Sequence, residues 1–388
     1  MKEETKITLL GRHPENNLGI INPPVYHAST VLFPTVDALE NRKSLPGKAV
    51  TYGLRGTPTT FALEEALASL EGGFDTVLCP SGLSAIALAL LTYLQAGDHL
   101  LMVDSVYGPT RRFCDVWLTK FGVETTYYDP LIGAGLARLM RPETKVVFVE
   151  SPGSNTFEVQ DVPAIGAVAR QGGATVIMDN AWASPLFFKP FTKGVDVSIQ
   201  AVTKYVSGHS DVMLGSVTAT EQAWPALKAA AGEFGLNAAP DDCYLALRGL
   251  RTISVRLARH QETGLTLARW LQERPEVDRV LHPALPDDPG YELWRRDFLG
   301  ASGLFGVILK PCSPAALAAM LEGYDLFGMG FSWGGYESLI LPTHPDQERT
   351  ATPWPAQGPS LRIHAGLEDP QDLIEDLKKG FERLKKQG

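Results

Sequence analysis

Short, nearly unbroken apolar runs alternate along the chain with longer helical segments. The apolar runs cover residues 75–80, 99–104, 145–150, 175–180 and 195–200. The helical segments between them include residues 81–94, 108–121 and 162–171. Buried apolar strands separated by helices are typical of a mostly parallel sheet covered on both faces. The pattern therefore predicts a large α/β domain over residues 61–251.

The two ends of the chain differ from this middle part. Residues 1–60 are rich in Pro, Asn, Thr and Gly and show no sustained period, which predicts an irregular arm. A helix is expected to follow from Thr60, with Gly72-Gly73 as its stop signal. A long helix over 252–272 precedes a Pro-rich connection, and strands and helices then mix. Residues 252–388 are therefore expected to form a smaller α+β domain.

Composition and charge exclude several classes of protein. A length of 388 residues suits two domains. The net charge of −9 and the scattered basic residues argue against nucleic acid or an anionic membrane as partner. The N-terminus lacks the apolar core of a signal peptide, and the most apolar stretch, 86–94, is about half of a membrane span of ~20 residues. The four separated cysteines show no zinc-ligand spacing. We therefore expect a cytoplasmic protein.

A lysine and an aspartate at strand ends are the first candidates for chemistry. Lys204 follows an apolar strand amid small and hydroxyl residues, and Asp179 ends the preceding strand. Alone, the lysine would be read as a surface residue and the aspartate as a turn former. Together they match a cofactor site in which a buried amine attacks a carbonyl and a carboxylate keeps a pyridine nitrogen protonated.

Other candidates are weaker when each is taken alone. Gly82 opens a helix after a strand, where backbone N–H groups form an anion site. Tyr107 could stack on an aromatic ring or simply pack in the core. Arg362, inside an apolar strand, needs an anion, which could be a substrate carboxylate or a structural partner. His209 and Asp211 resemble a metal pair but have no third ligand nearby, so no metal is predicted.

Nearly the whole chain resembles the Cys/Met-metabolism family of pyridoxal-phosphate (PLP) enzymes, of fold type I. The resemblance rests on motifs spread along the sequence: YGLRGTPT (52–59), PSGLS (80–84), SVYGP (105–109), ESPGS (150–154), DNAW (179–182), TKYVSGHSD (203–211), FSWGGYESL (331–339) and LRIHAGLED (361–369). The stretch TKYVSGHSD with the upstream Asp-Asn is the most specific. The implied fold is a PLP-dependent transferase-like large domain with a smaller C-terminal domain.

The resemblance implies a role for each matching residue. Lys204 would be the catalytic lysine that carries PLP as a Schiff base, and Tyr107 would act with it and stack on the ring. Asp179 would hold the ring nitrogen. The remaining assignments are the phosphate ligands Gly82, Leu83, Thr203 and a neighbouring subunit's Tyr52, and the substrate-binding residues Arg362, Ser332 and Trp333.

The implied activity is that of a carbon–sulfur lyase acting on a sulfur amino acid. Trp333 and Ser154 favour the branch that removes a thiol from Cβ, with L-cystathionine as substrate. A γ-lyase, a γ-synthase, a broad cysteine-conjugate lyase and a racemase share the same machinery and stay as alternatives. A non-catalytic protein on this scaffold is a remote one. The resemblance also implies a homotetramer with shared active sites.

One position departs from the family pattern. The phosphate clamp usually reads Tyr-x-Arg, but here Leu54 takes the third place and Arg55 follows it. Neighbouring residues in an extended segment point to opposite sides. Arg55 is therefore not predicted to replace the missing guanidinium.

Overall fold

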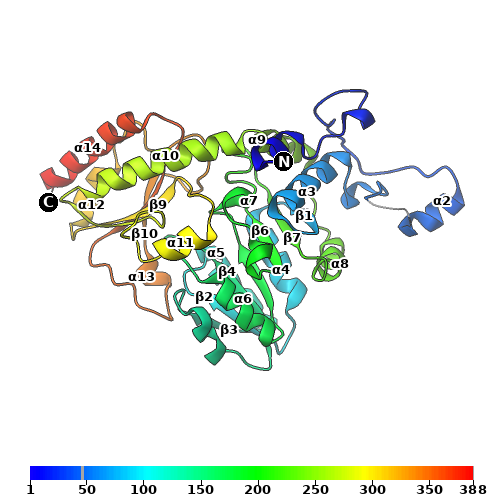
Figure 1. Ribbon diagram of the computed structural model, residues 1–388, viewed down its shortest axis with the longest axis horizontal. Helices are drawn as coiled ribbons and strands as arrows, with labels where there is room; N and C mark the ends of the chain where they lie inside the picture. The colour runs from blue at the N-terminus through cyan, green and yellow to red at the C-terminus, as the bar shows by residue number, and fades with distance from the viewer. Residues whose placement is uncertain (45–47, 388) are drawn as a thin grey trace.

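The large domain is built on a seven-stranded sheet. The computed structural model describes residues 1–44 and 48–387 (Figure 1). The strand order is β1-β7-β6-β5-β4-β2-β3, and only β7 runs antiparallel to its neighbours. The strands are β1 (Asp75–Cys79), β2 (His99–Val103), β3 (Glu124–Tyr128), β4 (Thr144–Glu150), β5 (Thr175–Asp179), β6 (Val197–Gln200) and β7 (Gly215–Ala219). The mostly parallel sheet is confirmed.

Sequence pattern explains most of these strands. All five residues of β2 and all four of β6 are buried, as expected for strands with helices on both faces. The pattern missed β3, an edge strand whose residues are mostly half-exposed. It also missed β7, whose Gly-Ser-Val-Thr-Ala sequence is buried but only weakly apolar. Both strands lack the continuous apolar run that marked the others.

Helices connect and cover the strands. Those of the arm and large domain are α1 (Glu3–Leu9), α2 (Val36–Glu40), α3 (Pro58–Glu71), α4 (Gly82–Tyr93), α5 (Gly108–Phe113), α6 (Val162–Gln171), α7 (Ser184–Phe187), α8 (Trp224–Phe234) and α9 (Pro240–Leu250). A π-helical turn, Cys114–Leu118, continues α5. Helix α3 begins two residues before the predicted start because Thr57 and Thr60 form a capping box.

The smaller domain has its own antiparallel sheet, of order β10-β11-β9-β8. Its strands are β8 (Val277–Leu281), β9 (Leu304–Leu309), β10 (Leu339–Thr343) and β11 (Ser360–His364). Its helices are α10 (Ile253–Gln272), α11 (Tyr291–Asp297), α12 (Pro314–Leu321), α13 (Pro345–Glu348) and α14 (Pro370–Gln387). The start of α10 packs in a core with α3 and α9, and its end packs in the small-domain core. This helix therefore joins the two domains.

The arm is more ordered at its start than the sequence predicted. Ile7 of α1 is fully buried, and Arg251 Nη1 donates to its carbonyl oxygen over 2.6 Å. The prediction of irregular structure is wrong for α1, since one buried residue in seven gives no readable period. Farther along, Leu18 and Leu32 are 97% and 89% exposed. The part that carries α2 extends away from both domains (Figure 1).

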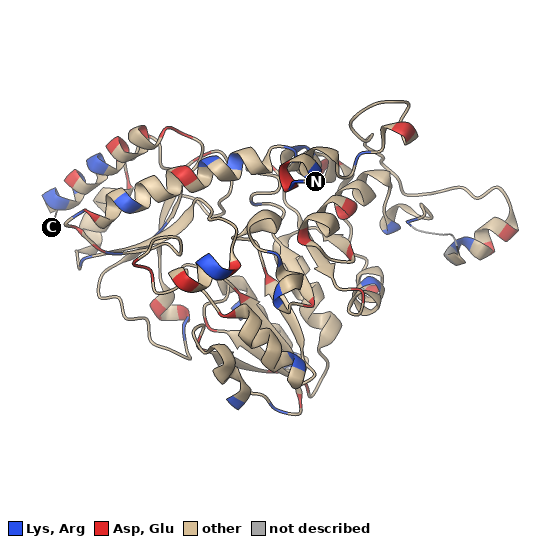
Figure 2. Ribbon diagram, viewed as in Figure 1, with Lys and Arg blue, Asp and Glu red and all other residues tan. Residues whose placement is uncertain are grey.

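Charges are mixed over the molecule, with Lys and Arg interspersed among Asp and Glu along the ribbon (Figure 2). Within residues 1–44 and 48–387, no helix combines the length and apolarity needed to cross a membrane. The four cysteines are all free thiols.

Candidate active site

Lys204 lies in a tight turn just after β6. Its N–H donates to the Ala201 carbonyl over 2.9 Å. Its Nζ donates to Ser332 Oγ over 2.6 Å and lies 5.2 Å from the centre of the Trp333 ring. Burial lowers the pKa of Lys204 to about 8, Arg362 also lowers it, and Asp179 opposes both. About a tenth of this amine is therefore uncharged at pH 7, far more than for a lysine of ordinary pKa, and the uncharged form is the nucleophile.

The loop that carries Ser332 and Trp333 presses directly on the Lys204 backbone. Ser332 and Gly334 have φ values of 76° and 89°. A Cβ at Gly334 would lie 3.0 Å from the Lys204 carbonyl carbon, so this place suits glycine alone. The Gly334 N–H and His364 Nε2 are 3.1 Å apart and form a hydrogen bond. The small domain thus places two predicted site residues beside the lysine.

Asp179 lies at the carboxyl end of β5, on the same edge of the sheet. Its Oδ1 accepts from the Ala181 N–H over 3.0 Å. Burial raises the pKa of Asp179 to about 6, while the Ala181 N–H and Lys204 lower it. A cation beside this carboxyl group would favour its ionised form. A protonated pyridine nitrogen is such a cation.

The start of α4 provides free backbone donors. Ser81 and Ser84 form a reciprocal capping box, and the N–H groups of Gly82 and Leu83 lie in the first turn, where helices have no internal acceptor. A Cβ at Gly82 would lie 3.2 Å from Ala201 Cβ, so the helix start lies against the loop that leads to Lys204. An anion such as a phosphate suits this place.

Thr203, the third predicted phosphate ligand in this chain, is already hydrogen-bonded. Its Oγ1 donates to the Leu214 carbonyl over 3.1 Å and accepts from the Leu214 N–H over 2.9 Å. To donate to a phosphate, the hydroxyl hydrogen must turn away from Leu214. The role of Thr203 stays a prediction.

Arg362 lies in β11, and Tyr107 immediately precedes α5. Arg362 Nη2 donates to the Ser332 carbonyl over 3.0 Å, and no carboxylate of the described residues lies within 4.0 Å of its guanidinium. Burial lowers the pKa of Arg362. The Tyr107 side chain is 43% exposed. Arg362 is therefore a half-buried cation that still needs an anion.

The predicted clamp from the arm is arranged differently from the sequence expectation. Residues Gly53–Arg55 form a 3-10 turn, so the premise of an extended segment is wrong. The Arg55 guanidinium lies over Gly232 of α8, in the space that a Cβ there would fill. Tyr52 is 51% exposed and makes no side-chain hydrogen bond within the described chain. Its contact with a neighbouring subunit stays a prediction.

The His209–Asp211 pair was not predicted to bind a metal. No group of three or more His, Cys, Asp or Glu residues suited to a metal occurs in the part of the chain that is described, and His209 Nδ1 instead lies 2.7 Å from the Ser207 carbonyl.

The sequence analysis missed Glu150, whose Oε2 accepts from the Tyr107 N–H over 2.8 Å. The only available signal was its place at the end of an apolar strand.

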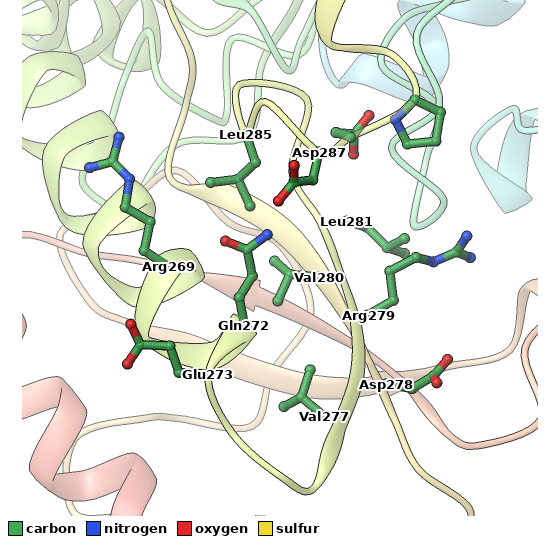
Figure 3. Close-up of a pocket in the computed structure, with 12 residues that line it drawn as sticks. Arg269, Gln272, Glu273, Val277, Asp278, Arg279, Val280, Leu281, Leu285 and Asp287 are labelled. Atoms are coloured by element: carbon green, nitrogen blue, oxygen red, sulfur yellow. The ribbon is translucent and has the colours of Figure 1, made fainter.

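A separate open pocket of about 540 Å³ lies in the small domain, between the end of α10, β8 and the loop after β8 (Figure 3). Arg269, Gln272, Arg279 and Asp287 are among the residues that line it. None of the predicted site residues is among them. The chemistry is therefore to be sought at the sheet edge around Lys204.

The residues at this edge fit PLP. Lys204 supplies an amine of lowered pKa for the aldehyde, Asp179 a carboxylate for the ring nitrogen, and α4 unpaired N–H groups for the phosphate. A profile of the Cys/Met metabolism PLP-dependent enzymes matches residues 4–382. The chain belongs to this family.

Relatives support the assignment to these Cys/Met metabolism enzymes. Cystathionine beta-lyase MetC of Escherichia coli (strain K12) is 44% identical over 390 residues, which cover 99% of each chain. L-alanine/L-glutamate racemase of Wolbachia pipientis wMel is 40% identical and covers 99% of this chain and 98% of its own. A crystal structure of cystathionine gamma synthase from Xanthomonas oryzae pv. oryzae, in complex with aminoacrylate and cysteine, is 30% identical, covers both chains fully and superimposes with a TM-score of 0.91.

These findings confirm the predicted family, the fold, the enzyme class and the PLP cofactor. As a member of the family, the protein acts on a small-molecule substrate.

The lowered pKa of Lys204 predicts how the cofactor-free protein captures PLP. Only the uncharged amine attacks an aldehyde, so the capture rate should rise about tenfold per pH unit below the pKa and level off above about 8. Stopped-flow absorbance on mixing with PLP over pH 6–10 measures this rate. A midpoint near 10.5, the ordinary value for lysine, would contradict the burial of the amine.

Proposed function

We propose that the protein is a PLP-dependent carbon–sulfur lyase that cleaves L-cystathionine by β-elimination, giving homocysteine, pyruvate and ammonia in methionine biosynthesis. The observation that carries the proposal is the Lys204 amine, hydrogen-bonded to Ser332 and beside Trp333. The near end-to-end likeness to the Escherichia coli enzyme supports the choice of reaction.

Arg362 gives the site its affinity for an amino acid. Its half-buried guanidinium has no carboxylate partner among the described residues, so a substrate α-carboxylate would neutralise it through a charge-assisted pair. The same guanidinium donates to the carbonyl of Ser332, whose hydroxyl accepts from Lys204. Carboxylate binding therefore orients Cα toward the lysine amine.

Lys204 would then move one proton within the site. When bound, PLP supplies an electron sink for the charge that develops at Cα. The uncharged Lys204 amine takes the Cα proton, and Ser332 Oγ holds Nζ in place. The electron pair left at Cα forms a double bond to Cβ, the bond between Cβ and sulfur breaks, and the Lys204 ammonium returns the proton to the leaving sulfur. Water then hydrolyses the released three-carbon enamine to pyruvate and ammonia. Asp179 stays ionised throughout and holds the ring nitrogen protonated.

We also propose a cytoplasmic homotetramer whose active sites share residues. The exposed apolar side chains of the arm, with Leu18, Leu32 and Val36 each at least 70% exposed, support a neighbouring chain as their cover. Tyr52 lies on the same arm and is half-exposed. Free thiols agree with a reducing compartment.

A comparison of substrates tests the proposed function. We expect kcat/KM for L-cystathionine to exceed that for L-methionine, a γ-elimination substrate, measured by 2-oxo acid release from the PLP-loaded protein. Racemisation of L-alanine, followed by polarimetry, should be slower still. Faster turnover of L-methionine would favour a γ-lyase, and faster racemisation would place the protein with its Wolbachia relative in activity.

A further inference from the structure

Two carboxyl groups stand side by side at the edge of the sheet that carries the site. Glu150 and Asp179 end the neighbouring parallel strands β4 and β5 and are direct partners in their register. Residues paired in this way point to the same face, and adjacent strands lie about 4.8 Å apart. The charge of Asp179 raises the pKa of Glu150, so the two half-buried carboxyl groups do not ionise equally readily.

The Glu150 carboxyl group is hydrogen-bonded to the main chain of Tyr107, the residue predicted to stack on the PLP ring. Its Oε2 accepts from the Tyr107 N–H over 2.8 Å. Its own backbone is fixed as well, because Gln160 Nε2 donates to the Glu150 carbonyl over 2.8 Å. Tyr107 immediately precedes α5, so this hydrogen bond fixes the point from which the Tyr107 ring projects.

The surroundings decide which of the two carboxyl groups carries the charge. Burial, and next the charge of Asp179, raises the pKa of Glu150 well above its ordinary range, and Glu348 adds to the rise. Backbone N–H groups of Tyr107 and Ser154 oppose it. Lys204, by contrast, lowers the pKa of Asp179. Asp179 is thus the anion of the pair, and Glu150 is the neutral acid.

Glu348 makes the same face less tolerant of a second anion. Its carboxyl oxygen lies 2.9 Å from where a Cβ at Gly108 would stand, next to Tyr107. It comes from α13 of the small domain. An ionised Glu150 would therefore be repelled by the charges of both Asp179 and Glu348.

We propose that Glu150 is a positioning residue, which holds the Tyr107 main chain against the cofactor site without adding a second anion beside Asp179. The proposal rests on the proposed function, because it assigns Tyr107 to the PLP ring. Glu150 itself touches neither the substrate nor the reacting atoms. Because Glu150 is neutral, Asp179 is the one anion of the pair that faces the protonated ring nitrogen.

Replacement of Glu150 separates a positioning role from a charged one. Glu150→Ala removes the acceptor of the Tyr107 N–H and should raise the Kd for PLP about tenfold. Glu150→Gln keeps a neutral side chain with a carbonyl oxygen at the same place and should restore most of the affinity. The Kd is measured by fluorescence quenching on titration of the cofactor-free protein with PLP. The matched control is Glu143→Gln, an exposed glutamate just before the same strand.

Each outcome decides the role of Glu150. Weaker PLP binding in the alanine variant, together with restored binding in the glutamine variant, supports the positioning role. A glutamine variant as weak as the alanine variant would overturn it, because the carboxylate charge would then be essential. Wild-type affinity in both variants would also overturn it. If the alanine variant fails to fold by circular dichroism, Glu150→Met, of similar length but without the oxygen acceptor, takes its place and should show the same loss of PLP affinity.

The Kd series does not depend on turnover. A wild-type protein that binds PLP but leaves L-cystathionine intact would overturn the proposed function, and the affinities of the variants would still decide whether Glu150 positions Tyr107.

Discussion

Replacement of Lys204 with alanine should abolish turnover and the visible absorbance of bound PLP. The variant loses the amine that holds the aldehyde and the group that moves the proton from Cα to sulfur. General acid–base catalysis alone contributes about 10²- to 10⁴-fold, so kcat should fall by at least that much. Steady-state release of 2-oxo acid and the absorbance of the purified protein measure the two effects.

Lys145→Ala is the matched control for that substitution. Lys145 is exposed, and its Nζ donates only to the Pro142 carbonyl, at the far end of β4 from the site. The control should keep both absorbance and turnover. Near-normal turnover in the Lys204 variant would contradict its assignment as the catalytic lysine.

Replacement of Asp179 with asparagine should lower kcat by about 100-fold or more while PLP stays attached. The amide has nearly the same shape and still accepts from the Ala181 N–H, but it cannot keep a pyridine nitrogen protonated by its charge. Without that proton, the ring draws less charge from Cα. The measurement pairs kcat with the bound-cofactor absorbance, and Asp287→Asn, at an exposed small-domain site, is the control.

A variant at Asp179 that lost PLP entirely would point to a structural role for this carboxylate instead. Full activity would show that another group protonates the ring nitrogen. Both results would contradict the assignment, whereas attached PLP with slow turnover supports it.

Much of the large domain could be predicted because its strands are buried on both faces. Continuous apolar runs located β1, β2, β4, β5 and β6 to within two residues. Lys204 and Asp179 followed from the rule that ligands bind beyond the carboxyl ends of such strands. Strands β3 and β7 lack an apolar run, and α1 buries a single residue, so no local pattern marked them.

The rest of the site depends on contacts between distant segments. Ser332 meets Lys204 across 128 residues of sequence, and no periodicity predicts that pairing. Glu150 was overlooked because a carboxylate after a strand is ordinary, and only the register with Asp179 gives it meaning. The position of Arg55 depends on a 3-10 turn and on the missing side chain at Gly232, which leaves space for the guanidinium. The sequence motif around Tyr52 shows neither feature.

The identity of the products tests the central claim most directly. The PLP-loaded protein is incubated with L-cystathionine, and the 2-oxo acid and the thiol amino acid are identified by mass spectrometry, with the Lys204→Ala variant as the blank. Pyruvate with homocysteine is the predicted result. The three-carbon half of cystathionine yields pyruvate only when the bond between its Cβ and the sulfur breaks. 2-Oxobutyrate with cysteine would contradict the account and assign the protein to the γ-cleaving branch of its family.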